Sequence, residues 1–395
     1  MVLAFLLCAA GIGGWFYLDH WINTPRQLDA VVTLDLPRGL GTMDIGQALQ
    51  AAGVIDQPWL FLAAVKLDHE QRALRAGEYQ FKPGETPAEI IEAMQTGAVL
   101  LHPVTVPEGR TVKEAYAILA GYDFLSGDLP SLPPEGSLMP ETYLVPRGTT
   151  RAQLVKRMSN DMKRTLDAAW KARAPNYPLS TPMQLLTLAS IIERETAKPD
   201  EYPLVAAVFL NRLRRGMRLQ TDPTVIYGLA DGMGSIGRPL TRADLASDTP
   251  FNTYKIAGLP PGPIANPGKK ALMAAAQPAA VDYLYFVADG SGGHVFASTL
   301  QDHNRNVANW RKIEAARQEL RSEEAPPPSS PDATPSSPPA ATPASPPDTT
   351  PASPPDAAPS APSDATPSPP SDATPPSSPD ATPSPTDGSE AAPPH

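Results

Sequence analysis

Two glutamates stand two residues apart in the segment "LASIIERET", residues 188–196, and they are the first candidates for chemistry. Glu193 and Glu195 follow a strongly apolar run, with Arg194 between them. In a helix, two positions along the chain correspond to about 200° around the axis. The two carboxyl groups would therefore point to opposite sides, and they cannot bracket one bond as the paired carboxylates of most glycoside hydrolases do. We expect one carboxyl group, rather than a pair, to act here.

The helix that must position these glutamates is predicted to begin at Thr181. Threonine suits the N-cap, Pro182 suits the first helical position, and Gln184 completes a capping box. The residues that follow are apolar around almost the whole circumference, which predicts a buried helix. These residues are Leu185, Leu186, Leu188, Ala189, Ile191 and Ile192.

A carboxyl group at the C-terminal turn of such a helix is suited to donate a proton. The negative end of the helix dipole and an apolar wall both disfavour the ionised form, so both raise the pKa above the reference of about 4.3. A raised pKa is what a general acid needs near neutral pH. The helix alone leaves a second interpretation open, in which both glutamates are surface residues paired with Arg194 or Lys198.

The segments after this helix are dense in Pro and Gly but also carry aromatic and amide side chains, a composition typical of ordered loops. Polar residues of this kind line clefts that bind sugars, because sugar hydroxyls need donors and acceptors. The segments are "MRLQTDPTVIYG" (217–228), "TPFNTYKIAGLPPGPIANPG" (249–268) and "AAAQPAAVDYLYFVADGSGGHVFASTLQDHN" (274–304).

Four motifs in this order resemble the signatures of the endolytic murein transglycosylases, a family of YceG-like proteins. They are "LASIIERET", "FLNRL" followed by "GMRLQTDPTVIYG", "NTYKIAGLPPGPIANPG" and "LYFVADGSGGHVF". The resemblance runs from about Val32 to Trp310. It implies a lyase that cuts peptidoglycan glycan strands between N-acetylmuramic acid and N-acetylglucosamine and leaves a 1,6-anhydro end. It also implies that Glu193, the first glutamate of its motif, is the catalytic acid, and that no cofactor is needed.

Lytic cleavage agrees with an isolated glutamate. One carboxyl group protonates the glycosidic oxygen, and the muramic C6 hydroxyl closes onto C1 and returns its proton to the same group. Because one residue acts first as acid and then as base, a second carboxylate is not required.

The resemblance implies substrate contacts for further motif residues, although each is equally compatible with loop scaffolding. The candidates are Gln220, Asp222, Thr224, Tyr227, Asn252, Thr253, Tyr254 and, in "PETYLVPRG", Glu141. Phe251 stands where such proteins often carry tyrosine, so a hydroxyl is not essential there. The arginine group 212, 214, 215 and 218 either meets stem-peptide carboxylates or forms a solvated helix end. The nine-residue gap between His294 and His303 matches no helical ligand spacing, so we predict no metal.

One pattern recurs four times before the motif helix: a short strand, a Pro/Gly turn and then a helix. The units begin at Val32, Tyr79, Val104 and Tyr143. Three of them contain a capping box, namely Thr86 with Glu89, Thr111 with Glu114, and Thr150 with Gln153. The pattern predicts an α+β fold built from small packing modules. Residues 77–97 also resemble LysM-like modules, which implies glycan binding as the sharper interpretation.

The two ends of the chain differ from its middle. Val2 to Leu18 carries no charge and spans about 25 Å as a helix, with Trp15, Tyr17 and Trp21 at its C-terminal edge. We predict an uncleaved membrane anchor rather than a signal peptide, because no basic residue precedes the run and bulky aromatics follow it. The one cysteine, Cys8, lies within it and excludes an intrachain disulfide.

At the other end, residues 325–395 hold 25 of the 50 prolines and no Lys, Arg or aromatic residue, so they are predicted to be disordered. Eight of the 42 acidic residues lie there, which leaves 34 acidic against 32 basic residues in the rest of the chain. A near-neutral folded part argues against a nucleic-acid-binding protein.

The predicted layout is α+β throughout, with a transmembrane anchor (1–21), a LysM-like module (28–100), a catalytic domain (101–320) and a disordered tail (321–395). The expected location is the cytoplasmic (inner) membrane, with a single span and the catalytic domain on the periplasmic side. Peptidoglycan strands are the expected partner, and the resemblance adds peptidoglycan synthases. The alternatives are a non-catalytic peptidoglycan-binding scaffold and an ordinary hydrolase that leaves reducing ends.

Overall fold

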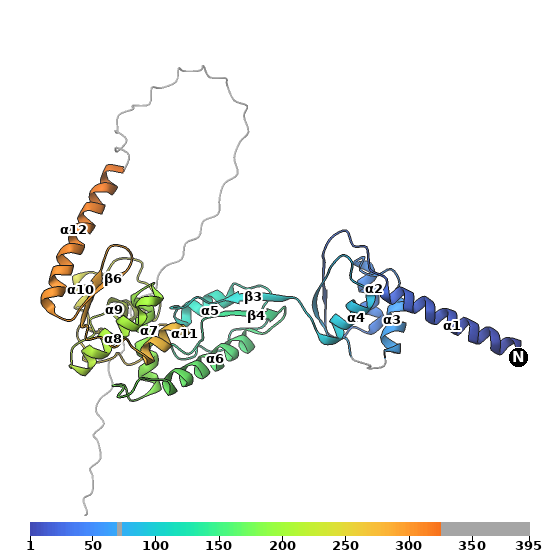
Figure 1. The fold of residues 1–395 in the computed structure, drawn as a ribbon, viewed down its shortest axis with the longest axis horizontal. Coiled ribbons are helices and arrows are strands. Elements are labelled where there is room, and N and C mark those ends of the chain that lie inside the picture. Colours follow the sequence, from blue (N-terminus) through green and yellow to red (C-terminus); the bar gives the residue numbers. More distant parts are fainter. Residues whose placement is uncertain (69–72, 325–395) are drawn as a thin grey trace, which may run out of the picture. The chain divides into compact units, whose positions relative to one another are not determined.

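The computed structural model describes residues 1–68 and 73–324, with side chains described as far as residue 317. Helices and three antiparallel strand pairs make a mixed α+β structure (Figure 1), as predicted. The segment 325–395, which was predicted to be disordered, lies outside the described residues.

The N-terminal helix α1 (Val2–Asn23) is continuous over 22 residues. In the part of the chain that the structure describes, it is the one helix long and apolar enough to cross a membrane, with a mean hydropathy of 1.7. An N-terminal signal sequence can have the same length and composition. The predicted anchor ended at residue 21, and the helix continues to Asn23.

All four predicted strand–turn–helix units are present. Strand β1 (Val32–Leu36) leads to α2 (Thr42–Ala51), β2 (Gly77–Phe81) to α4 (Pro87–Thr96), β3 (Leu101–Thr105) to α5 (Val112–Ala120), and β4 (Thr142–Pro146) to α6 (Arg151–Lys171). The three predicted capping boxes form at Thr86, Thr111 and Thr150. These caps were predictable because their donors and acceptors lie three residues apart in the chain.

The units associate two by two. Strands β1 and β2 pair antiparallel, with Val32 opposite Phe81, and β3 and β4 pair antiparallel, with Val104 opposite Tyr143. The first pair, with α2, α3 (Pro58–Leu67) and α4, encloses a core that includes Phe61 and Met94. The second pair, with α5 and α6, encloses a separate core. The segment predicted as one catalytic domain therefore contains this core in addition to the one described next.

The third and largest core surrounds α7 (Pro182–Glu195), which contacts α6, α8 (Tyr202–Arg214), α9 (Asp222–Leu229) and α11 (Lys269–Ala276). Eight consecutive residues, Leu185 to Ile192, are buried, and the predicted cap at Thr181 forms. The predicted buried helix is confirmed. The remaining elements are η1 (Pro199–Glu201), α10 (Arg242–Leu245), β5 (Tyr285–Ala288), β6 (His294–Ala297) and α12 (Leu300–Glu324), which continues past residue 320.

Candidate active site at the C-terminal end of helix α7

The two glutamates at the end of α7 have entirely different partners, as the helical geometry predicted. Glu193 bonds to Tyr202 and to the backbone of Gly268, whereas Glu195 bonds to Thr221. Two candidate sites therefore flank the same helical turn.

Both carboxyl oxygens of Glu193 accept hydrogen bonds. Tyr202 Oη donates to Oε1 at 2.8 Å, and the backbone N–H of Gly268 donates to Oε2 at 2.8 Å. Gly268 is the N-cap of α11, where unpaired N–H groups and the helix dipole favour an acceptor. Glu193 therefore connects α7 to α8 and to the start of α11.

Acidic side chains gather on the Glu193 side. Burial raises the pKa of Glu108, and the nearby carboxyl groups of Glu193 and Glu141 raise it further. Glu108 lies directly against the Cα of Gly268, where an added Cβ would come within 1.8 Å of its Oε1 atom. The structure thus places Glu141, a predicted substrate-binding residue, near Glu193 and exposed to solvent.

Glu195 lies on the opposite side, with its carboxyl group deep in the molecule although the residue keeps some accessible surface. Thr221 Oγ1 donates to its Oε2 at 2.5 Å. Burial raises the pKa of Glu195, and Asp222 nearby raises it further, while the Thr221 hydrogen bond, His294 and Arg212 oppose the shift. The raised pKa expected for a carboxyl group at this turn is therefore found at Glu195.

The predicted substrate-binding motifs converge on the Glu195 side. Gln220 N donates to Thr253 O at 3.2 Å, and Thr221 N donates to Thr253 Oγ1 at 3.0 Å. Tyr254 Oη donates to Asp222 Oδ1 at 2.6 Å. Residues 220–224 and 252–254 thus lie side by side next to Glu195, although they are separated in the chain, whereas Gly268 at the end of the second segment bonds to Glu193.

These motif residues differ in whether a ligand can reach them. Thr224, Asn252 and Thr253 are fully buried and bonded within the protein, which is the scaffolding role. Asp222 and Gln220 are exposed and Tyr254 is half-buried. Gln220 also has a left-handed backbone, with φ of 51°, which marks a tight turn into α9. Of these motif residues, Asp222, Gln220 and Tyr254 are therefore the ones accessible to a ligand.

Tyr227 lies at the far end of α9, in a pocket of about 410 Å³ that also contains Phe251, Lys113 and Glu135. Its ring meets that of Phe251 edge-on at 4.8 Å, and its Oη donates to Glu135 Oε2 at 3.4 Å. Burial raises the pKa of Glu135 to about 7, although the N–H groups of Val112 and Gly136 stabilise its carboxylate.

The arginine group divides into residues that bond to loop carbonyl oxygens, a role that was not predicted, and residues that are exposed at the end of α8. Arg212 is half-buried and donates to the carbonyl oxygens of Leu284 at 2.7 Å and Leu219 at 2.8 Å, so it supports the loops beside Glu195. Arg218 donates to Tyr254 O at 3.0 Å. Residues 214 and 215 are exposed.

The two histidines considered for a metal have separate surroundings. The His294 ring nitrogen Nδ1 lies 2.7 Å from a Glu201 oxygen. The His303 ring stacks on Tyr285 with 5.1 Å between ring centres.

Sequence reasoning missed Glu108, Glu135 and Tyr202. A signal for the two glutamates was present, because both occur in the tripeptide Pro-Glu-Gly. The glycines that follow, Gly109 and Gly136, have φ of 75° and 77°, a left-handed conformation that glycine adopts without strain. The turns place the preceding glutamates beside Gly268 and Tyr227, respectively.

The comparisons with known proteins agree on one family. The model of the YceG-like family matches residues 34–309. The endolytic murein transglycosylase of Bacillus subtilis (strain 168) is 31% identical, over 74% of this chain and 89% of the relative. That of Streptococcus pneumoniae (serotype 2, strain D39 / NCTC 7466) is also 31% identical, over 78% of this chain but only 64% of the relative's own length. A crystal structure of a yceG-like protein from Listeria monocytogenes has 31% identity, covers 70% of this chain and 98% of that chain, and superposes with a TM-score of 0.43.

Proposed function

The chain belongs to the YceG-like family, and we propose that it is an endolytic murein transglycosylase that cleaves peptidoglycan glycan strands. The substrate is the bond between N-acetylmuramic acid and N-acetylglucosamine, and the product is a 1,6-anhydromuramic end. Such cleavage would end the elongation of a nascent strand. The observation that carries the proposal is the family match over residues 34–309, which includes the Glu193 carboxyl group at the end of α7 and the motif segments 217–228 and 249–268 beside the same helical turn.

The chemistry requires a single carboxyl group. In its protonated form it donates to the glycosidic oxygen as the bond from that oxygen to muramic C1 breaks. The muramic O6 then bonds to C1, and its proton passes to the carboxylate, which restores the acid. Tyr254 and Asp222, which bond to each other, are the proposed contacts to sugar hydroxyls, because a hydroxyl and a carboxylate supply the donors and acceptors that sugars need.

We propose that Glu193 is this proton donor, as the family resemblance suggested. Tyr202 Oη and the N–H of Gly268 each donate to one of its oxygens, and because each carboxyl oxygen has a second acceptor site, these bonds orient the group without blocking it. The carboxyl group of Glu195 lies deep in the molecule and bonds to Thr221, so it is poorly placed to meet a glycosidic oxygen. We propose that Glu195 supports the neighbouring loops rather than transferring the proton.

A digest of purified glycan strands tests the activity. The full chain in detergent is incubated with strands, and the products are weighed by mass spectrometry before and after borohydride reduction. We expect internal cleavage to anhydro ends, which are one water lighter than reducing ends and resist borohydride. Reducing ends would support a hydrolase instead. Strand binding without cleavage would support a non-catalytic scaffold.

We further propose that α1 anchors the chain in the cytoplasmic membrane, with the remainder on the outer side. The helix is long and apolar enough to span a bilayer. The core formed by β1, β2 and α2–α4 is the proposed LysM-like glycan-binding module. Peptidoglycan synthases are the proposed protein partners, because strand termination requires contact with a growing strand.

A further inference from the structure

The end of helix α1 is built into the core of the first α+β module. Trp21 is 5% exposed, and its Nε1 donates to Asp56 Oδ1 at 2.7 Å. Arg26 lies over the Trp21 ring at 4.8 Å and donates to the same Asp56 oxygen at 3.0 Å. These contacts join the C-terminal end of α1 to the core of the module.

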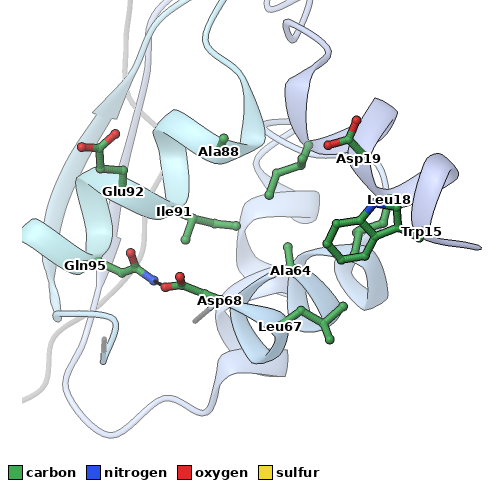
Figure 2. A pocket seen from close by; sticks show the side chains of 11 residues that line it. Trp15, Leu18, Asp19, Ala64, Leu67, Asp68, Ala88, Ile91, Glu92 and Gln95 are labelled. Carbon is green, nitrogen blue, oxygen red and sulfur yellow. Dashed lines mark hydrogen bonds between the residues drawn. The ribbon is translucent and has the colours of Figure 1, made fainter. Parts of the chain in front are cut away.

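A groove of about 270 Å³ lies where α1 joins helices α3 and α4 (Figure 2). Its floor is apolar, with Leu18 and Ile22 from α1, Ala64 and Leu67 from α3, and Ile91 from α4. Leu67 is 54% exposed. The groove is thus an open apolar surface that the described residues leave unfilled.

One wall of the groove belongs to the segment proposed to cross the membrane. Trp15 and Leu18 line the groove and also lie within the uncharged run Val2–Leu18, most of whose side chains are exposed. Tryptophan is typical of the boundary between hydrocarbon and headgroups. The groove therefore begins at the height where the hydrocarbon chains of the bilayer meet the headgroups. Its apolar floor is continuous with the surface of α1 that faces those chains.

The charged residues among the described lining are all acidic. They are Asp19 on α1, Asp68 after α3 and Glu92 on α4. Asp68 accepts a hydrogen bond from Gln95 Nε2 at 2.7 Å, while Asp19 and Glu92 are exposed at the rim. An acidic rim attracts an ammonium group and repels a lipid that carries net negative charge.

We propose that this groove binds one membrane lipid with a primary amine headgroup, such as phosphatidylethanolamine. A hydrocarbon chain lies along Leu18, Leu67 and Ile91, and the amine lies at the acidic rim beside Asp19, on the α1 side of the groove. The proposal rests on the membrane anchorage proposed above. A lipid bound in this groove would hold the module at a fixed height and orientation at the membrane surface.

Lipid retention tests the proposal. The full chain is reconstituted into vesicles that contain phosphatidylethanolamine and phosphatidylglycerol, extracted in mild detergent and weighed by native mass spectrometry. We expect one retained phosphatidylethanolamine per chain.

Ala88→Trp fills the groove from α4, and we expect it to lower the retained fraction about tenfold or more. Ala51→Trp, at an exposed alanine ending α2, is the matched control and retains the lipid.

A second variant tests the rim without filling the groove. Asp19→Asn with Glu92→Gln changes two exposed residues, so the fold is kept, and we expect it to lose the preference for phosphatidylethanolamine over phosphatidylglycerol. Equal retention in wild type and Ala88→Trp would overturn the proposal, as would a protein segment found in the groove in place of lipid. Vesicle flotation distinguishes membrane anchoring by α1 from lipid binding in the groove. A chain that floats with vesicles but retains no lipid would support the anchor and refute lipid binding in the groove.

Discussion

At the scale of single residues, the separation of Glu193 and Glu195 is the central feature of the candidate site. One residue lies between them, yet one bonds to Gly268 and the other to Thr221. This follows from the helix period, and it places the two carboxyl groups in different chemical environments. The Glu195 carboxyl group is enclosed, and burial raises its pKa, whereas Glu193 lies beside Gly268 and the acidic Glu108.

We therefore predict different effects of two isosteric substitutions. Glu193→Gln removes the proton donor and is expected to lower the cleavage rate about 10²- to 10⁴-fold with little change in fold. Glu195→Gln changes an enclosed, hydrogen-bonded carboxyl group and is expected to lower stability by about 1 kcal/mol, with a smaller effect on rate. Anhydro product release and thermal melting of both variants are the measurements. If Glu195→Gln alone abolished cleavage, the acid would be Glu195.

Glu135 gives a prediction about pH. Its pKa in the fold is raised from 4.5 to about 7, so the folded chain binds this proton more tightly than the unfolded chain. Its contribution to stability is present below about pH 4.5 and is lost as the pH rises to about 7. The loss amounts to up to about 3 kcal/mol. Glu135→Gln is expected to remove this dependence.

Thermal melting of the full chain at pH 5 and pH 8 measures the effect of Glu135. We expect Glu135→Gln to be more stable than wild type at pH 8 and close to it at pH 5. The control is Glu92→Gln, at an exposed residue of α4, which should follow the wild type at both values. Parallel curves for wild type and Glu135→Gln would contradict the assignment.

At the scale of elements, local sequence signals located the units around the site. The strand–turn–helix units, their capping boxes and the cap of α7 depend on residues a few positions apart, so they could be predicted without the fold. The pairing of the units could not, because β1 and β2 are separated by two helices. The separate core under β3 and β4 was missed for the same reason.

The cap of α7 offers a test at this scale. Thr181 Oγ1 accepts the N–H of Gln184 at 3.2 Å, and Thr181→Ala removes this acceptor. We expect a loss of about 1 kcal/mol in stability, because α7 lies at the centre of the largest core. The control Thr33→Ala changes an exposed threonine on β1 and should melt as wild type does. Equal melting of both variants would show that the cap contributes nothing.

At the scale of the whole molecule, the composition of the chain predicts which part is dispensable for chemistry. The family match ends at residue 309, and residues 325–395 contain no Lys, Arg, Trp, Tyr or Phe with which to hold a glycan. We expect a chain that ends at Glu324 to cleave purified strands at the wild-type rate. The same digest and mass spectrometry measure this. A large loss of activity would assign residues 325–395 a part in the reaction.

The sequence was sufficient for everything that depends on neighbours in the chain: the α+β elements, their caps, the buried helix α7 and the opposite directions of its two glutamates. Tertiary contacts were needed for the rest. Thr221 lies 26 residues from Glu195, Gly268 lies 75 residues from Glu193, and Tyr227 lies 92 residues from Glu135. Burial and electrostatic surroundings arise from such distant contacts, so no local pattern could distinguish the buried acid Glu195 from Glu193, or the buried Asn252 from the exposed Asp222.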